Sequence, residues 1–353
     1  MARTQLLTIH VTVASSRFGF SFRSSFMLQK VRTTVGGLLG PIARRWTAAN
    51  PRVIMYHRFG PRAPSISAED LETHLRYIRE SFNPVRLDSL LGMLKVGETP
   101  PPRSVVLTVD DGYRDFLEVA YPLLQRYEVP ATVFVVSKFI RGGFWLWFDR
   151  LRFTFDSAAA QDFKVMGPDG PVRLRLDSPQ SRAAAWESVM TRCLRLPPEE
   201  RNTYVAACET AAGVVVPDEP FGEFASLSRE DIEKMDPRIV EIGSHTRTHP
   251  ILSGCSDADV TAEIAGSKAE IEAAIGRRVS TFCYPNGLSE DFDPRAEHAV
   301  DTAGYLGAVT AYGGLVCCSQ ANRLALPRMS AYRGFNSMRN ELNGVQHLFA
   351  GWR

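Results

Sequence analysis

Two uninterrupted apolar runs, each followed at once by a polar cluster, constrain the fold of this chain most strongly. Residues 104–109 (SVVLTV) and 131–136 (ATVFVV) lack a polar face, which is typical of strands buried on both sides of a parallel sheet. A helical pattern at 116–127 lies between them, so the order is strand, helix, strand. The rhythm recurs in short apolar runs at 53–56, 239–243, 281–284 and 306–310. We therefore predict an α/β fold with a parallel sheet.

The rhythm is interrupted once, between residues 139 and 224. This part contains the aromatic stretch 144–148 (FWLWF) and helical patterns at 181–196 and 199–212. We interpret it as a helical and aromatic insertion that caps one end of the sheet. We predict a basic N-terminal extension at 1–50 and a barrel made of two pieces, 51–138 and 225–335. The insertion occupies 139–224, and a C-terminal tail follows at 336–353.

Composition excludes several classes of protein. Hydrophobic residues at 44% and charged residues at 23% are ordinary globular values, which excludes a disordered chain. No apolar run reaches the roughly 18 residues of a membrane-spanning helix. A net charge of +2 gives no bias toward nucleic acid, and none is expected as a partner. The six cysteines are scattered without CxxC spacing, which argues against a disulfide scaffold and favours a cytoplasmic location.

Charge is distributed unevenly along the chain. Residues 1–68 contain ten Lys and Arg and no Asp or Glu. Within this arm, residues 26–46 place apolar side chains at helical spacing among basic ones, which predicts a helix packed on the body. The alternative is a basic amphipathic segment in peripheral contact with an anionic membrane. The apolar stretch 6–14 is interrupted by His and Thr, so a secretion signal is not expected.

Polar clusters follow two of the predicted strands, where catalytic groups gather in parallel α/β folds. Asp110 and Asp111 leave the first buried run, and neighbouring residues leaving a strand point to opposite sides. One carboxylate can therefore bind a metal while the other acts as a base. His245 and His249 follow another strand, and a turn there can bring both imidazoles to one ion. One carboxylate and two imidazoles leave an open coordination position, which indicates a catalytic zinc-type site.

A third loop reads YPNG at 284–287, and its backbone N–H groups could face a developing oxyanion. In this order the three elements resemble the polysaccharide deacetylase family, the carbohydrate esterases of family 4 with the NodB homology domain. The T-F-D-D-G motif is matched at 108–112 with Val for Phe, and the H-[ST]-x-x-H motif fully at 245–249. Cys283 stands where many members carry Arg. The resemblance covers roughly residues 50–335.

The resemblance implies a distorted (β/α) barrel and a metal-dependent hydrolase. The expected reaction removes the N-acetyl group from an N-acetylhexosamine of a glycan, a glycolipid or a sugar precursor. Asp110 would be the general base, and a divalent ion, expected to be Zn²⁺, would be held by Asp111, His245 and His249. The ion would polarise the amide carbonyl and lower the pKa of a bound water, whose proton the base would take.

The remaining site predictions concern the oxyanion and the sugar. The resemblance implies that the backbone N–H of Tyr284 stabilises the tetrahedral intermediate and that Pro285 and Asn286 contact substrate. Trp145 and Trp147 are candidates for an aromatic platform, since sugar rings stack on indoles. The alternative is that these aromatic residues anchor the insertion to the barrel.

One departure from the family pattern concerns the general acid. Many members carry a late Leu-His motif, but this chain reads LPRMS at 326–330. Arg328 cannot easily donate a proton, so it is expected to be structural or to tune Asp110. His57, at the end of the first strand, is the predicted substitute, and a hydrogen-bonded barrel residue is its alternative role.

Two competing functions remain open at this level. One is hydrolysis of a non-sugar or formylated amide, and the other is an inactive carbohydrate-binding relic. The complete Asp-Asp and His-x3-His sets argue against the relic, because sugar binding alone does not need them.

Overall fold

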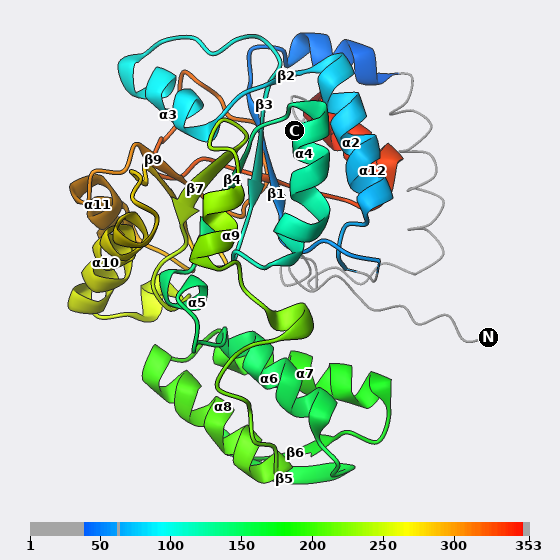
Figure 1. Ribbon diagram of the computed structural model, residues 1–353, viewed down its shortest axis with the longest axis vertical. Coiled ribbons are helices and arrows are strands. Elements are labelled where there is room, and N and C mark those ends of the chain that lie inside the picture. The colour runs from blue at the N-terminus through cyan, green and yellow to red at the C-terminus, as the bar shows by residue number, and fades with distance from the viewer. Residues whose placement is uncertain (1–38, 62–63, 349–353) are drawn as a thin grey trace.

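The computed structural model describes residues 39–61 and 64–348, and its centre is a curled parallel sheet (Figure 1). The strand order in the described chain is β10-β1-β3-β4-β7-β8-β9, with β2 paired to β3. The strands are β1 (Arg52–Tyr56), β2 (Asn83–Pro84), β3 (Ser104–Val109), β4 (Ala131–Val135), β7 (Val240–Ser244), β8 (Thr281–Cys283), β9 (Gly307–Val309) and β10 (Met329–Ser330). The two runs that led to the α/β prediction are β3 and β4, and the fold-class prediction is confirmed.

The register brings the carboxyl ends of the strands to one edge of the sheet. Tyr56 pairs with Val109, and Ser244 pairs with both Val135 and Phe282. The residues that directly follow these strands therefore emerge level with one another. This shared edge is the reason that polar residues far apart in the sequence meet there.

A C-terminal segment brings the two ends of the sheet together. Leu326 exchanges backbone hydrogen bonds with Ala308 and Thr310 beside β9, each at 2.9 Å. A few residues later, the Ala331 N–H donates to Met55 of β1 at 3.0 Å. Residues 326–331 therefore lie between β9 and β1 and complete the distorted barrel.

Helices cover the outside of the sheet. They are α2 (Ala68–Ser81), α3 (Leu87–Val96), α4 (Tyr121–Tyr127), α9 (Arg229–Lys234), α10 (Asp257–Ile275), α11 (Pro294–Thr302) and α12 (Phe335–Asn343). The short α5 (Ser137–Ile140) follows β4 and lies between the sheet and the insertion (Figure 1). Helix α2 is capped by Ser67, whose side chain accepts from Asp70 N, and it buries Leu71 and Leu75 against the core. The single helix predicted at 116–127 instead begins with a π-helical turn at Phe116–Ala120.

The interruption of the α/β rhythm forms a body with its own core below the barrel in Figure 1. Its elements are α6 (Trp147–Ser157), β5 (Asp162–Gly167), β6 (Gly170–Arg175), α7 (Pro179–Cys193) and α8 (Pro198–Ala212). The antiparallel β5–β6 hairpin was not predicted from the sequence. The polar and apolar alternation of its strands, over 162–166 and 172–175, is short, and a short alternation is a weak signal for a strand.

The two ends of the described chain pack on the barrel. Residues 39–46 are helical, with Ala43 buried and Arg44 Nη1 donating to the Tyr77 hydroxyl at 3.2 Å. Part of the expected C-terminal tail is α12, where the Leu342 carbonyl accepts from Arg52 Nε at 2.9 Å. The described part of the tail is therefore integral to the fold.

Residues 1–38 lie outside the described residues, so most of the predicted basic arm does too. The peripheral membrane contact and the cytoplasmic location stay predictions. Among the described residues, no helix has the length and apolarity needed to cross a membrane.

Candidate metal and catalytic site

The loop after β3 presents two carboxylates in different directions. Asp110 continues the pairing of β3 with β1, because its N–H donates to the Tyr56 carbonyl at 3.0 Å. Asp111 then turns into the left-handed region at φ 75°, which non-glycine residues rarely adopt. Gly112 follows at φ 83°, and a Cβ there would lie 3.0 Å from Val135 Cγ1. This tight, strained turn explains how adjacent Asp side chains serve different sides of the site.

Asp111, His245 and His249 form a buried group that we call the candidate metal triad. Their ligand atoms all lie within 4.8 Å of one another. Asp111 Oδ1 lies 3.6 Å from His245 Nε2 and 3.4 Å from His249 Nε2. Tetrahedral ligands at zinc-like bond lengths are about 3.3 Å apart, so these separations suit a shared ion. They exceed those of ordinary hydrogen bonds.

The charges and hydrogen bonds of the triad also favour a cation. Burial and the neighbouring charge of Asp110 raise the pKa of Asp111, so the ionised form needs a positive partner. Burial lowers the pKa of both imidazoles, which keeps them neutral as metal binding requires. His245 Nδ1 contacts the Cys283 carbonyl at 2.8 Å, which directs Nε2 toward Asp111. His249 Nδ1 is buried with no hydrogen-bond partner among the described residues.

The loop from His245 to His249 is held by its own side chains. Thr246 and His249 have φ values of 67° and 57°, so the chain turns sharply between the two imidazoles. The Thr246 hydroxyl oxygen accepts from His249 N at 3.0 Å. Glu263 on α10 accepts from the backbone N–H groups of Arg247 and Thr248 at 2.7 and 2.9 Å. The predicted turn between His245 and His249 is therefore confirmed, and hydrogen bonds to α10 hold it in place.

Arg328 clamps the predicted base. Its side chain is 1% exposed, and Nη1 and Nη2 donate to the two Asp110 carboxylate oxygens at 2.7 Å each. Burial alone would raise the pKa of Asp110, but the charge and hydrogen bonds of Arg328 hold it well below its usual range. Nη2 also donates to Cys283 Sγ at 3.2 Å. Of the two roles expected for Arg328, tuning Asp110 matches these contacts.

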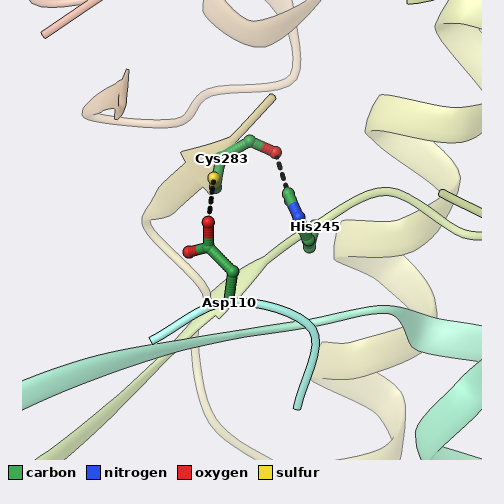
Figure 2. A group of neighbouring side chains, drawn as sticks. All are labelled: Asp110, His245 and Cys283. Atoms are coloured by element: carbon green, nitrogen blue, oxygen red, sulfur yellow. Dashed lines mark hydrogen bonds between the residues drawn. The ribbon is translucent and has the colours of Figure 1, made fainter. Parts of the chain in front are cut away.

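Cys283 belongs to a second group with Asp110 and His245, shown in Figure 2. Its Sγ lies 3.6 Å from Asp110 Oδ2, and its carbonyl binds His245 (Figure 2). This group is the poorer metal site, because Arg328 already occupies the Asp110 carboxylate. Burial also raises the pKa of the Cys283 thiol well above its usual value, which opposes the thiolate that a metal would need. Of the two groups, the candidate metal triad is therefore the one whose chemistry suits a divalent ion.

Replacing Arg328 by Met is expected to destabilise the protein by about 3–5 kcal/mol, because it leaves the Asp110 charge buried and unpaired. In the folded fraction the pKa of Asp110 rises, so the acidic limb of the pH–rate profile moves to higher pH. Denaturant unfolding and the pH profile measure the two effects. Arg333→Met is the matched control, since its pair with Asp70 is partly exposed and worth about 0–1 kcal/mol. Equal stability losses in both variants would contradict the clamp.

The triad and the base line one small pocket. Its cavity of about 20 Å³ is large enough for a water or an ion and too small for a sugar ring. His57 lines it with a side chain 29% exposed, and its Nε2 lies 3.6 Å from Asp110 Oδ2. Phe148 forms another wall and contacts the His249 ring edge-on, with centroids 5.3 Å apart. The aromatic stretch therefore does reach the site, through Phe148.

The predicted oxyanion role of Tyr284 is wrong in this structure. Its N–H donates to the Val309 carbonyl at 3.3 Å, as part of the pairing between neighbouring strands. Asn286 lines the pocket at φ 58°, and its N–H has no acceptor among the described residues. The Asn286 side chain is bound to Asp291, so only its backbone is available to substrate. Pro285 sets the turn but does not line the pocket.

The predicted platform of Trp145 and Trp147 beside the metal is not supported, because neither indole lines the catalytic pocket. Their exposed fractions are 6% and 5%, and their indole N–H groups donate to backbone carbonyls of Pro217 and His249 at 2.7 and 3.3 Å. The alternative role, anchoring the insertion to the barrel, fits these contacts. The sequence could not distinguish a sugar platform from an anchor, because either role places the same aromatic residues beside the same strand end.

Replacing Trp145 by Ala is expected to cost about 3–5 kcal/mol of stability, because it empties a packed aromatic core position. The KM of the folded fraction should not change, since the indole does not line the catalytic pocket. Thermal unfolding and steady-state kinetics measure both quantities. Trp46→Ala is the control, because Trp46 is 78% exposed and its loss should have little effect. A raised KM without a stability loss would restore the platform.

Comparison with known proteins agrees with this geometry. A sequence model described as polysaccharide deacetylase matches residues 97–167 and 202–307, together half of the chain. The chain belongs to the polysaccharide deacetylase family. The gap between the two matched ranges of this family member, 168–201, falls within the insertion, and all three members of the triad fall within the matched ranges.

Several relatives of this family member are known. One is YxkH of Bacillus subtilis (strain 168), provisionally assigned as a polysaccharide deacetylase, which is 28% identical over 90 residues. Another is the poly-beta-1,6-N-acetyl-D-glucosamine N-deacetylase of Escherichia coli (strain K12), 32% identical over 72 residues. The matches cover 25% and 20% of this chain, and 32% and 11% of those relatives.

The fold also matches solved structures. The Streptococcus pyogenes deacetylase PplD in complex with acetate aligns with a TM-score of 0.54 at 17% identity. IcaB from Ammonifex degensii aligns with a TM-score of 0.55 at 15% identity. The alignments cover 83% and 84% of this chain and 97% of each of the other two. At these identities the comparison establishes the barrel fold.

Proposed function

We propose that this family member is a metal-dependent N-deacetylase that acts on an N-acetylhexosamine of a glycan, a glycolipid or a sugar precursor. The observation that carries the proposal is the placement of Asp110 beside the candidate metal triad in one buried pocket. A base and a metal site at one point suit attack of water on an amide. The name of the Escherichia coli relative supports an N-acetylated sugar as the substrate class.

Asp111, His245 and His249 would hold the divalent ion, with Zn²⁺ the proposed metal. When bound, such an ion polarises the acyl carbonyl and lowers the pKa of water. Asp110 takes the proton of the attacking water, and its pairing with Arg328 keeps it ionised for that purpose. The backbone N–H of Asn286 would donate to the oxyanion in place of Tyr284.

His57 is the proposed general acid. It lies on the pocket wall, and it is more exposed than Asp110 or the triad. As the carbon–nitrogen bond breaks, the protonated imidazole gives its proton to the leaving amine. The products are acetate and a free amino sugar. The proton that Asp110 took from water then passes to His57, which restores the starting state of both side chains. Because the cavity is too small for a sugar ring, the ring would lie outside its mouth.

An acyl-release panel tests the proposed function. The metal-loaded protein is incubated with N-acetylglucosamine oligomers, N-formylated sugars and simple non-sugar acetamides, and acetate, formate and free amine are measured. We expect acetate and amine in equal amounts from the acetylated sugars. Release from the non-sugar amides alone would favour the competing amidohydrolase. Sugar binding without release of any acid would favour the binding relic.

A further inference from the structure

A second cavity lies where the insertion meets the barrel. Its volume is about 450 Å³, within the range of small-molecule sites and far larger than the catalytic pocket. It is lined by Lys138 of α5, Arg201 of α8 and Thr248 of the triad loop, together with aromatic and aliphatic side chains. It shares no lining residue with the catalytic pocket.

Arg201 is unusual among the buried charges of the described chain. It is 2% exposed, yet its nearest polar contacts are two 3.4 Å hydrogen bonds from Nε and Nη2 to the neutral Asn202 Oδ1. Its guanidinium lies 5.0 Å from the centre of the Trp147 ring. Burial lowers its pKa to about 10 against the opposing charge of Glu263, and no described carboxylate lies within the 4.0 Å of an ion pair. A buried unpaired charge is costly, so a stable fold normally provides a partner.

The charged side chains that line the cavity also favour an anionic ligand. Arg150 also lines it but is neutralised by Glu209. Lys138 forms no ion pair within 4.0 Å with any described carboxylate. Two unpaired cations from different elements therefore face one cavity, against the single exposed carboxylate of Asp218. The fork of an arginine, together with a lysine on the same cavity, suits a carboxylate or a phosphate.

We propose that this cavity binds a small organic anion, with a carboxylate or phosphate group between Arg201 and Lys138. The apolar lining from Phe144, Trp145 and Val205 accommodates a ring-sized body, as in a uronate or a sugar phosphate. The cavity is separate from the proposed catalytic centre, and binding there does not depend on deacetylase activity. Trp147 Nε1 and Thr248 connect its wall to the back of the triad loop.

Calorimetric titration of the full-length protein tests the proposal with four probes: glucuronate, glucose 6-phosphate, inorganic phosphate and neutral glucose. We expect the two ring anions to bind and glucose not to bind. Arg201→Met and Lys138→Gln should each weaken binding about tenfold or more, the size of a lost charge-assisted hydrogen bond. Arg195→Gln, which removes an exposed arginine outside the cavity, should leave the affinity unchanged.

Thermal unfolding separates a binding role from a packing role. Arg201→Met should keep or raise the melting temperature, because it removes an unpaired buried charge. A lowered melting temperature with unchanged anion affinity would make Arg201 a packing residue and overturn the proposal. Equal binding of inorganic phosphate and glucose 6-phosphate would overturn the ring-sized ligand, and binding of none of the anions would overturn the site.

Discussion

Replacing Asp110 by Asn is expected to lower turnover by about 10²–10⁴-fold while the metal content stays near that of the unaltered protein. The carboxylate that takes the proton from water is lost, but no ligand of the candidate metal triad is removed. Single-turnover kinetics and elemental analysis of the same preparation measure the two quantities. Turnover within a few-fold of the original would reduce Asp110 to a structural role.

Asp111→Asn provides the matched comparison. The two carboxylates are neighbours in sequence and both are buried, so the same chemical change is made in nearly the same surroundings. We expect Asp111→Asn to lose metal and turnover together. If both variants kept their metal, Asp111 would not be a ligand, and the division of roles between the adjacent carboxylates would be wrong.

Replacing His249 by Ala is expected to remove metal and activity together. Its Nε2 lies 3.4 Å from Asp111 Oδ1, so it supplies a third of the candidate metal triad. The loss of affinity should exceed the roughly 10–100-fold that loss of an outer-shell partner costs. Elemental analysis after dialysis against a weak chelator measures it. His298→Ala is the control, because His298 is exposed on α11. Full metal occupancy in His249→Ala would exclude this triad as the metal site.

The sequence by itself determined the parallel sheet and the residues that could carry the chemistry. Runs such as 104–109 are apolar throughout, and only a strand covered on both faces hides such a run. The polar clusters follow these runs directly, so their place at the carboxyl edge follows from the chain order. Asp110, Asp111, His245 and His249 were assigned to one site on that basis, and the structure brings all four to one pocket.

Tertiary structure alone decided which contacts these groups make. Arg328 lies 218 residues from Asp110 in the chain, and no local pattern predicts that the closing segment places its guanidinium against that carboxylate. The N–H of Tyr284 is occupied because β8 and β9 pair in one register, and register depends on the whole sheet.

Burial of the insertion's aromatic residues was decided in the same way. The indoles of Trp145 and Trp147 are equally apolar in a core and on a sugar platform, and only their packed neighbours distinguish the two. Arg201 faces the same cavity as Lys138 only because the fold brings α8 and α5 together. Sequence periodicity specifies which side of an element is apolar, whereas pairing and enclosure depend on elements that meet only in the folded chain.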